Sequence, residues 1–258
     1  MNFFWFERTN NFNIKELSEE LEDNGFSGVL FTYSFFNDDY FVKIANAIDS
    51  NKKIKYMVAI RPYAISAQYL CMINNAFKKI SKDRIVINII TGWVHDQEKS
   101  IGGIQGNVND LSNNIDRSNY LIEYVKSLKN VKSSIPEFYV SVTNEILFKN
   151  VCNNKVIVPY SLYKQNRFDL DGEKTMISVF PIIVKDEQEL LSLKKEKIEQ
   201  DAEYFTIETF EKFLNELESK KITNVLVGND SPELSKKNIL SFVSDFTNKK
   251  INILGGKK

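Results

Sequence analysis

Polar side chains able to hold a ligand stand where two apolar segments of the chain end. Arg61 follows the apolar run KYMVAI, and Asn88 and Thr91 lie at the end of the run IVINII. A guanidinium offers a planar fork of donors to an oxyanion, while an amide or a hydroxyl group both donates and accepts. The residues between the runs have an amphipathic helical pattern, so the stretch 55–92 predicts a parallel βαβ unit. Since ligands bind at the carboxyl ends of parallel strands, we expect these three side chains at a binding edge.

Arginine is rare in this chain, which has 29 lysines and five arginines. In so lysine-rich a chain, an arginine is expected where its planar fork is needed and not its charge alone. Arg61 and Arg84 stand at strand ends, where a structural ion pair is the alternative to ligand binding. Arg117 opens a predicted helix over 116–129.

The only histidine, His95, follows the Thr-Gly pair on a predicted loop. Histidine titrates near neutral pH and serves as a general acid or base, so His95 is a catalytic candidate. The alternative is a solvated loop side chain. One histidine cannot form a multi-histidine metal site, and Cys71 and Cys152 lack metal-binding spacing, so we expect no metal and two buried thiols. The pair Asp38-Asp39 is interpreted as a helix cap and not as a carboxylate dyad.

Eight apolar segments alternate with helical patterns along the chain. Alternation at this count favours a single-domain α/β fold over residues 1–258, a closed (β/α)8 TIM barrel, with an open doubly wound sheet as the alternative. The predicted strands are 2–6, 28–33, the run from 55 to Arg61, the run ending at Gly92, 137–142, 155–160, 175–184 and 224–228. The predicted helices include 14–24, 38–49, 116–129, 145–151 and 231–246.

Four other segments carry weaker patterns. Residues 93–116 are rich in Gly and Asn and predict a long functional loop. Residues 161–174 predict an irregular loop, and 186–219 predict one or two helices with a break near Ala202. Pro181 is expected near the end of its strand or at a bulge. The tail after Asn252 is predicted to fray.

The bulk properties indicate an ordinary soluble protein of 258 residues. The chain is 43% hydrophobic and 26% charged, with a formal net charge of zero. This balance favours neither nucleic acid nor a membrane surface as a partner. No apolar run approaches the roughly 20 residues of a membrane helix, and the first residues lack a signal-peptide pattern. We therefore expect a cytoplasmic location.

Three short motifs carry a resemblance to a known family. They are Ala59-Ile60-Arg61-Pro62, the turn 80–84 (ISKDR) and the strand end 88–92 (NIITG). These residues resemble the luciferase-like flavin monooxygenases, and among them the alkanesulfonate monooxygenase branch. The resemblance is strong over residues 1–124 and weak afterwards, and the chain is shorter than the branch. It implies a shortened (β/α)8 barrel.

The resemblance also implies a flavin site. It assigns Thr91, in the Thr-Gly pair, to the polar edge of the flavin ring, which the amide of Asn88 could also bond; the alternative is that Thr91 bonds backbone groups at a turn. It places Arg117 beside the phosphate, a dianion that suits a guanidinium. The branch holds phosphate at a Gly-rich loop that leads into a helix, where Thr143 and Asn144 stand here without the glycines. Arg61 is retained as a further cofactor-binding candidate.

Other positions depart from the branch. Its histidine after the first strand is replaced near Asn10, its cysteine after the second strand corresponds to Asn37, and its Arg-x-His corresponds to residues 179–181. Asn37 is the catalytic candidate at the cysteine position. Without those cations a sulfonate would lack charge complementarity, so we expect a substrate other than an alkanesulfonate. Phe6, Tyr33 and Phe35 are expected to wall a flat substrate.

The function implied by the resemblance is a monooxygenase that uses reduced FMN and O2 on a small organic substrate. A separate flavin reductase would supply the cofactor, because the chain has no Gly-x-Gly-x-x-Gly motif for a nicotinamide. The resemblance also implies a homodimer. Two alternatives stay open: a hydride-transfer enzyme that uses the deazaflavin F420, and a non-catalytic flavin-binding or dimer-partner protein.

Overall fold

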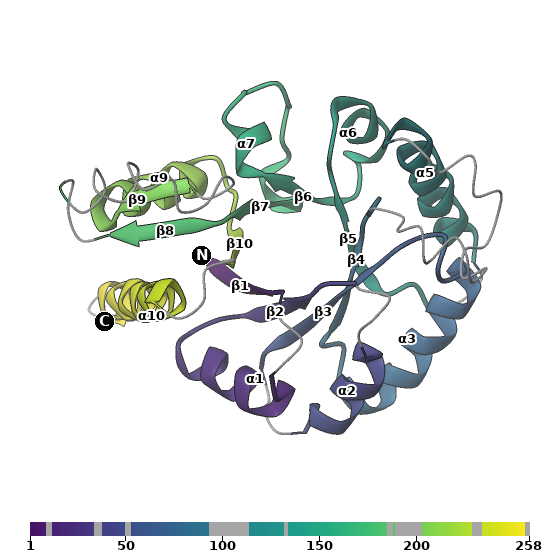
Figure 1. Cartoon of the computed structure of the whole chain (residues 1–258), viewed down its shortest axis with the longest axis horizontal. Coiled ribbons are helices and arrows are strands. Elements are labelled where there is room, and N and C mark those ends of the chain that lie inside the picture. Colours follow the sequence, from purple (N-terminus) through teal and green to yellow (C-terminus); the bar gives the residue numbers. More distant parts are fainter. Residues whose placement is uncertain are drawn as a thin grey trace.

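Eight parallel strands close into a barrel (Figure 1). The computed structural model of the chain describes residues 1–8, 12–33, 38–49, 53–92, 114–131, 134–184, 188, 203–228 and 234–255. Closure comes from parallel pairing of the first strand with both the second and the last strand of the barrel. This confirms the predicted (β/α)8 barrel and excludes the open sheet. The barrel strands are β1 (Asn2–Glu7), β2 (Gly28–Phe31), β3 (Lys55–Ile60), β4 (Ile85–Ile89), β5 (Glu137–Ser141), β6 (Lys155–Pro159), β7 (Thr175–Val179) and β10 (Asn224–Gly228).

The helices lie around the outside of the barrel (Figure 1). They are α1 (Ile14–Asp23), α2 (Tyr40–Ala47), α3 (Ala67–Ser81), α5 (Asn114–Asn130), α6 (Glu145–Val151), the single turn α7 (Tyr160–Tyr163), α9 (Ile207–Ser219) and α10 (Leu234–Gly255), with a 3-10 turn η2 (Gly172–Lys174). Asp39 caps α2, as predicted, because its Oδ1 accepts from the backbone N–H of Val42 at 3.1 Å.

The predicted strand 175–184 is wrong as a single element. It divides after Val179, and the second part, β8 (Pro181–Val184), leaves the barrel and pairs in parallel with β9 (Glu203–Thr206). Pro181 has no N–H to donate to a ladder, which is the physical reason for a break at this point. β8, β9 and α9 lie together beside the barrel (Figure 1).

Three further boundaries differ from the prediction. β9 falls in a stretch predicted as helical, because four residues are too few for a strand period to show. The predicted loop 161–174 holds most of α7 and all of η2. α10 continues to Gly255, past the predicted end near Phe246, so the tail is helical beyond Asn252. The residues 231–233 at its predicted start lie outside the described residues.

The two cysteines are free, but only Cys71 is buried. Burial raises the pKa of the Cys71 thiol, which keeps it protonated and unreactive. Cys152 is half-buried, contrary to the prediction, because it stands at the C-cap of α6, where the helix meets solvent.

Side chains alternate between the barrel interior and the layer beneath the helices. The interior cluster consists of Phe4, Leu30, Met57, Ala59, Val86, Tyr139, Ile157, Met176 and Leu226. In the pairing of β1 with β2, Phe4 stands opposite Gly28. A Cβ at Gly28 would come within 2.4 Å of the Phe4 ring and 2.9 Å of the backbone oxygen of Lys55. The Phe4 ring is therefore accommodated because its neighbour at this position has no side chain.

We predict that Gly28→Ala destabilises the barrel by about 1–3 kcal/mol through overpacking. Chemical denaturation of the purified variant measures the loss. Phe4→Leu serves as the matched partner, because a smaller side chain at that position relieves the clash. The double variant should lose less stability than the two single losses added together. Additive losses would show that the ring and the glycine do not constrain each other.

Candidate functional site

Arg61, Tyr33 and Gly92 meet at the carboxyl ends of β2, β3 and β4. The guanidinium carbon of Arg61 lies 4.7 Å from the centroid of the Tyr33 ring, a cation–π contact. Gly92 has φ +61°, and a Cβ there would come within 2.5 Å of Arg61 Nε. Glycine thus meets two needs at this position, the left-handed backbone and the close approach of the arginine. Arg61 is 6% exposed, so its charge is buried at the edge of the barrel.

A hydrogen-bonded pair of polar side chains, Asn88 and Ser141, lies inside the barrel just below this edge. Ser141 Oγ on β5 donates to Asn88 Oδ1 on β4 at 2.8 Å. Asn88 is 3% exposed and Thr91, two residues beyond β4, is 5% exposed. The side-chain oxygen of Asn88 is used by Ser141, while its Nδ2 group carries two donors. Buried hydroxyl and amide groups in an otherwise apolar interior are the chemistry that a polar ring edge requires.

The structure places Asn144 and Thr143 at the start of α6, beside α5. Asn144 Oδ1 accepts from the backbone N–H of Leu147 at 2.8 Å, and its Nδ2 donates to Ser118 Oγ at 3.0 Å. Its side chain therefore caps α6 and ties it to α5. Glu145 occupies the first turn, where its carboxylate would repel a phosphate. The Asn144 side chain is engaged in these bonds, whereas Thr143 is exposed and its hydroxyl is accessible to a ligand.

Arg117 lies on α5 and is 6% exposed. Burying a guanidinium costs free energy unless the group contacts hydrogen-bond acceptors or a negative charge. The burial of Arg117 therefore indicates a defined role for its side chain. Arg84, by contrast, donates from Nε to the backbone oxygen of Ser81 at 3.0 Å and from Nη2 to the backbone oxygen of Ile48. Arg84 thus bonds backbone carbonyl groups near the amino end of β4, far along the strand from the candidate edge. This favours its structural interpretation.

Three of the predicted residues, Asn37, Phe35 and His95, lie outside the described residues, and their roles stay predictions. Phe6 and Tyr33 are described, and both pack against the interior cluster of the barrel. The structure thus brings Phe6, Tyr33, Arg61, Asn88 and Thr91 to the carboxyl end of the barrel.

Two residues at this end were missed as site candidates. The guanidinium carbon of Arg8 lies 4.9 Å from the Phe6 ring centroid and 4.5 Å from that of Phe180. The two rings are 5.5 Å apart. Arg8 was visible as one of the five arginines, but nothing local in the sequence pairs it with Phe180, which follows a strand far along the chain.

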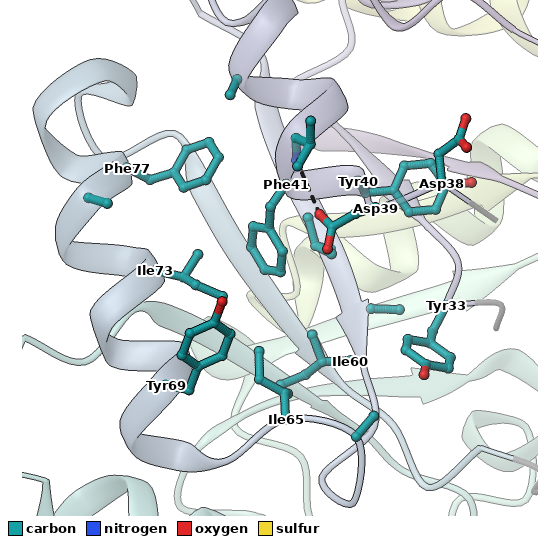
Figure 2. Close-up of a pocket in the computed structure, with 16 residues that line it drawn as sticks. Tyr33, Asp38, Asp39, Tyr40, Phe41, Ile60, Ile65, Tyr69, Ile73 and Phe77 are labelled. Carbon is teal, nitrogen blue, oxygen red and sulfur yellow. Dashed lines mark hydrogen bonds between the residues drawn. The ribbon is translucent and has the colours of Figure 1, made fainter. Parts of the chain in front are cut away.

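An apolar groove of about 640 Å³ lies between α2 and α3 (Figure 2). Its lining includes Phe41, Ile60, Ile73 and Phe77, and among the described residues that line it the charged ones are Asp38 and Asp39. Tyr33 also lines the groove and contacts Arg61, so this one ring belongs to both the groove and the strand-end cluster.

The opposite mouth of the barrel is also polar. The carboxylate of Glu137 on β5 forms ion pairs with Lys55 Nζ at 2.8 Å and with Lys155 Nζ at 2.5 Å. Burial alone would raise the pKa of Glu137, but the hydrogen bonds from Lys155 and Lys55 outweigh it and hold the pKa below its ordinary value. Burial, with Glu137 nearby, raises the pKa of Tyr139 to about 12. In TIM barrels this amino-terminal face serves stability, so we interpret the cluster as structural.

Among the described residues, no three His, Cys, Asp or Glu side chains gather as a metal site would require. Within the same ranges no helix has the length and apolar character needed to cross a membrane.

No protein-family model matches the chain. Several solved structures share its fold over nearly their whole lengths. The coenzyme F420-dependent tetrahydromethanopterin reductase of Methanopyrus kandleri matches with a TM-score of 0.65 and 15% identity, over 94% of this chain and 97% of that one. The EDTA monooxygenase of Chelativorans sp. BNC1 matches with a TM-score of 0.66 and 9% identity, over 97% of this chain and 94% of that one.

A third structure carries a flavin. It is the type II Baeyer-Villiger oxygenating constituent of 3,6-diketocamphane monooxygenase, from the CAM plasmid of Pseudomonas putida, in complex with FMN. It matches with a TM-score of 0.62 and 11% identity, over 95% of this chain and 96% of that one. At such identities the likeness establishes the shared (β/α)8 fold.

The ion pairs of Glu137 predict a pH dependence. Because the folded pKa lies below the ordinary 4.5, the pairs stabilise the fold above pH 4.5, and this stabilisation is lost as the pH falls through the lowered value. Glu137→Gln should lower the free energy of unfolding by about 1 kcal/mol at neutral pH. It should also flatten the pH dependence below 4.5. Denaturation at a series of pH values measures both.

Glu123→Gln is the matched control for that experiment. Glu123 pairs with Lys126 at 2.7 Å, but the two side chains are 69% and 63% exposed. This substitution should change the free energy of unfolding by less than about 0.5 kcal/mol. Equal effects of the two substitutions would contradict a special role for the barrel-mouth cluster.

Proposed function

We propose that the chain is a flavin-dependent oxidoreductase that uses reduced FMN and O2 to oxygenate a small organic substrate. The observation that carries the proposal is the group of buried polar side chains at the carboxyl end of the barrel. Arg61, Asn88 and Thr91 are each at most 6% exposed, and they end two adjacent strands. The (β/α)8 barrel places its catalytic sites at this end. Solved structures with the same fold include monooxygenases, one of them in complex with FMN.

The residues present fit the ring of a flavin. Asn88 and Thr91 would contact its polar edge, and Phe6 and Tyr33 would wall the substrate site beside the ring. When bound, reduced FMN supplies the electrons that activate O2. The protein would orient the ring, bind the substrate beside it and keep water out through its apolar walls. Arg61, held by Tyr33 and Gly92, would place a fixed positive charge at the edge of the site.

The phosphate of FMN was expected to lie at Thr143, Asn144 and Arg117, and the structure changes this set. Asn144 is engaged as the cap of α6, and Glu145 adds negative charge there. Arg117 and the exposed Thr143 therefore remain as our candidates for the phosphate. His95 and Asn37 stay catalytic candidates by prediction, and Phe35 stays a candidate wall of the substrate site.

F420 is the second candidate cofactor. The likeness to an F420-dependent reductase favours it, with a TM-score of 0.65. A hydride-transfer enzyme would require neither O2 nor a separate flavin reductase, both of which the monooxygenase requires. A non-catalytic flavin-binding or dimer-partner protein would bind a flavin without turnover. We retain the expectation of a substrate other than an alkanesulfonate and of a cytoplasmic enzyme.

Cofactor binding tests the proposal. Titration with oxidised and anaerobically reduced FMN, and separately with F420, should show tightest binding of reduced FMN. Thr91→Val keeps the shape of the side chain but removes its hydroxyl, and Arg117→Met removes the guanidinium. Each should weaken FMN binding by about tenfold or more, as expected for loss of a hydrogen bond to a charged or buried group. Absorbance or fluorescence titration gives the dissociation constants.

Arg167→Met is the control for that titration, because Arg167 is an exposed residue of the chain beyond α7. Unchanged FMN affinity in both site variants would remove these residues from the cofactor site. Tighter binding of F420 than of FMN would favour the hydride-transfer alternative.

We also propose that the protein is a homodimer that uses the outer face of α2 and α3. Val42, Tyr69, Met72 and Ile80 are between 46% and 62% exposed on these helices, beside the apolar groove. Exposed apolar patches of this kind mark interaction surfaces. Light scattering should give twice the 29.9 kDa chain mass, and Met72→Glu should reduce it to the monomer. Ile207→Glu on α9 is the control, and a monomeric parent protein would contradict the proposal.

A further inference from the structure

Arg8, Phe6 and Phe180 form a cluster at the rim of the barrel that the cofactor contacts proposed above do not use. Arg8 directly follows β1, and Phe180 stands between β7 and β8. In the barrel order β1 and β7 lie on either side of β10. The cluster therefore joins two strands that are not themselves hydrogen-bonded to each other.

Gly228 makes this arrangement possible. It is the last residue of β10 and stands opposite Phe6 in the pairing of β1 with β10. A Cβ at Gly228 would come within 2.6 Å of Phe6 Cβ and 2.8 Å of the Phe6 backbone oxygen. Because β10 has no side chain at this point, Phe6 and Phe180 approach to 5.5 Å across it.

The two rings support the guanidinium of Arg8. Its central carbon is 4.9 Å from the centroid of Phe6 and 4.5 Å from that of Phe180. Contact with two rings, whose planes are tilted by 48°, holds the group in place, and its N–H donors lie at its edge. Arg8 is exposed, so a ligand entering from the mouth of the barrel can reach it.

From this geometry we propose that Arg8 is a substrate-recognition residue that binds a carboxylate. A carboxylate is planar and accepts two parallel N–H···O bonds from a guanidinium, so an arginine held in place over two rings at the mouth of the barrel suits it. The apolar body of the substrate would lie against Phe6 and Phe180. The inference rests on the proposed function, and it names the substrate class as small carboxylic acids with an apolar body.

Calorimetric titration of the flavin-free protein with benzoate tests this inference without any turnover. Benzamide is the matched probe, since it has the same ring and shape without the charge. The wild-type protein should bind benzoate at least about tenfold more tightly than benzamide, and Arg8→Met should remove that difference. Arg8→Lys keeps the charge but loses the fork, so it should weaken benzoate binding by a smaller factor.

Two results would overturn the inference. One is the absence of any benzoate binding by the wild-type protein, and the other is equal benzoate affinity in the wild type and Arg8→Met. If Arg8→Met does not fold, Arg8→Lys and Phe180→Leu decide the question, because each should still weaken benzoate binding. FMN titration of the same samples separates the two proposals, since failure of FMN binding with benzoate binding intact would leave the carboxylate site standing.

Discussion

Closure of the barrel is the constraint on which the rest of the structure depends. The first strand pairs with β2 on one side and with β10 on the other, over registers from Asn2 to Glu7. Because strand side chains alternate with a period of two, closure assigns every second residue to the interior and the others to the helical layer. A shift of one residue in any strand would exchange the two sets. The parallel direction also brings all eight carboxyl ends to one face.

Two glycines on the neighbouring strands make room for the aromatic side chains of β1. Gly28 stands opposite Phe4, and Gly228 stands opposite Phe6. The first contact lets an aromatic ring fill the core. The second, at the rim, lets the rings of Phe6 and Phe180 meet and carry Arg8. The same packing rule thus serves stability inside the barrel and the proposed recognition surface at its mouth.

The two ends of the barrel use charge differently. At the amino-terminal mouth, Glu137 is matched by Lys55 and Lys155 in a pair of short contacts. At the carboxyl end, arginine guanidinium groups lie over aromatic rings, as Arg61 does over Tyr33 and Arg8 over Phe180. Stacking over a ring orients a guanidinium while its edge keeps its hydrogen-bonding donors. Cations also lie over rings at the amino-terminal end, as Lys155 does over Tyr139 and Arg84 over Tyr56, but there they also bond Glu137 or backbone carbonyl oxygens. This pairing is our reason for assigning stability to that end.

The sequence by itself determined the barrel, most helix positions and the strand-end location of Arg61, Asn88 and Thr91. Those features follow from local patterns: apolar runs, helical periodicity and polar residues at the ends of runs. It failed where contacts between distant segments decide the outcome. Whether the chain after Val179 continues in the barrel depends on a partner strand, β9, that a four-residue segment does not reveal. Likewise only the tertiary structure brings Arg8 onto Phe180 and commits Asn144 to α6 and Ser118. Such contacts depend on barrel register and helix packing, which join residues that no spacing along the chain connects.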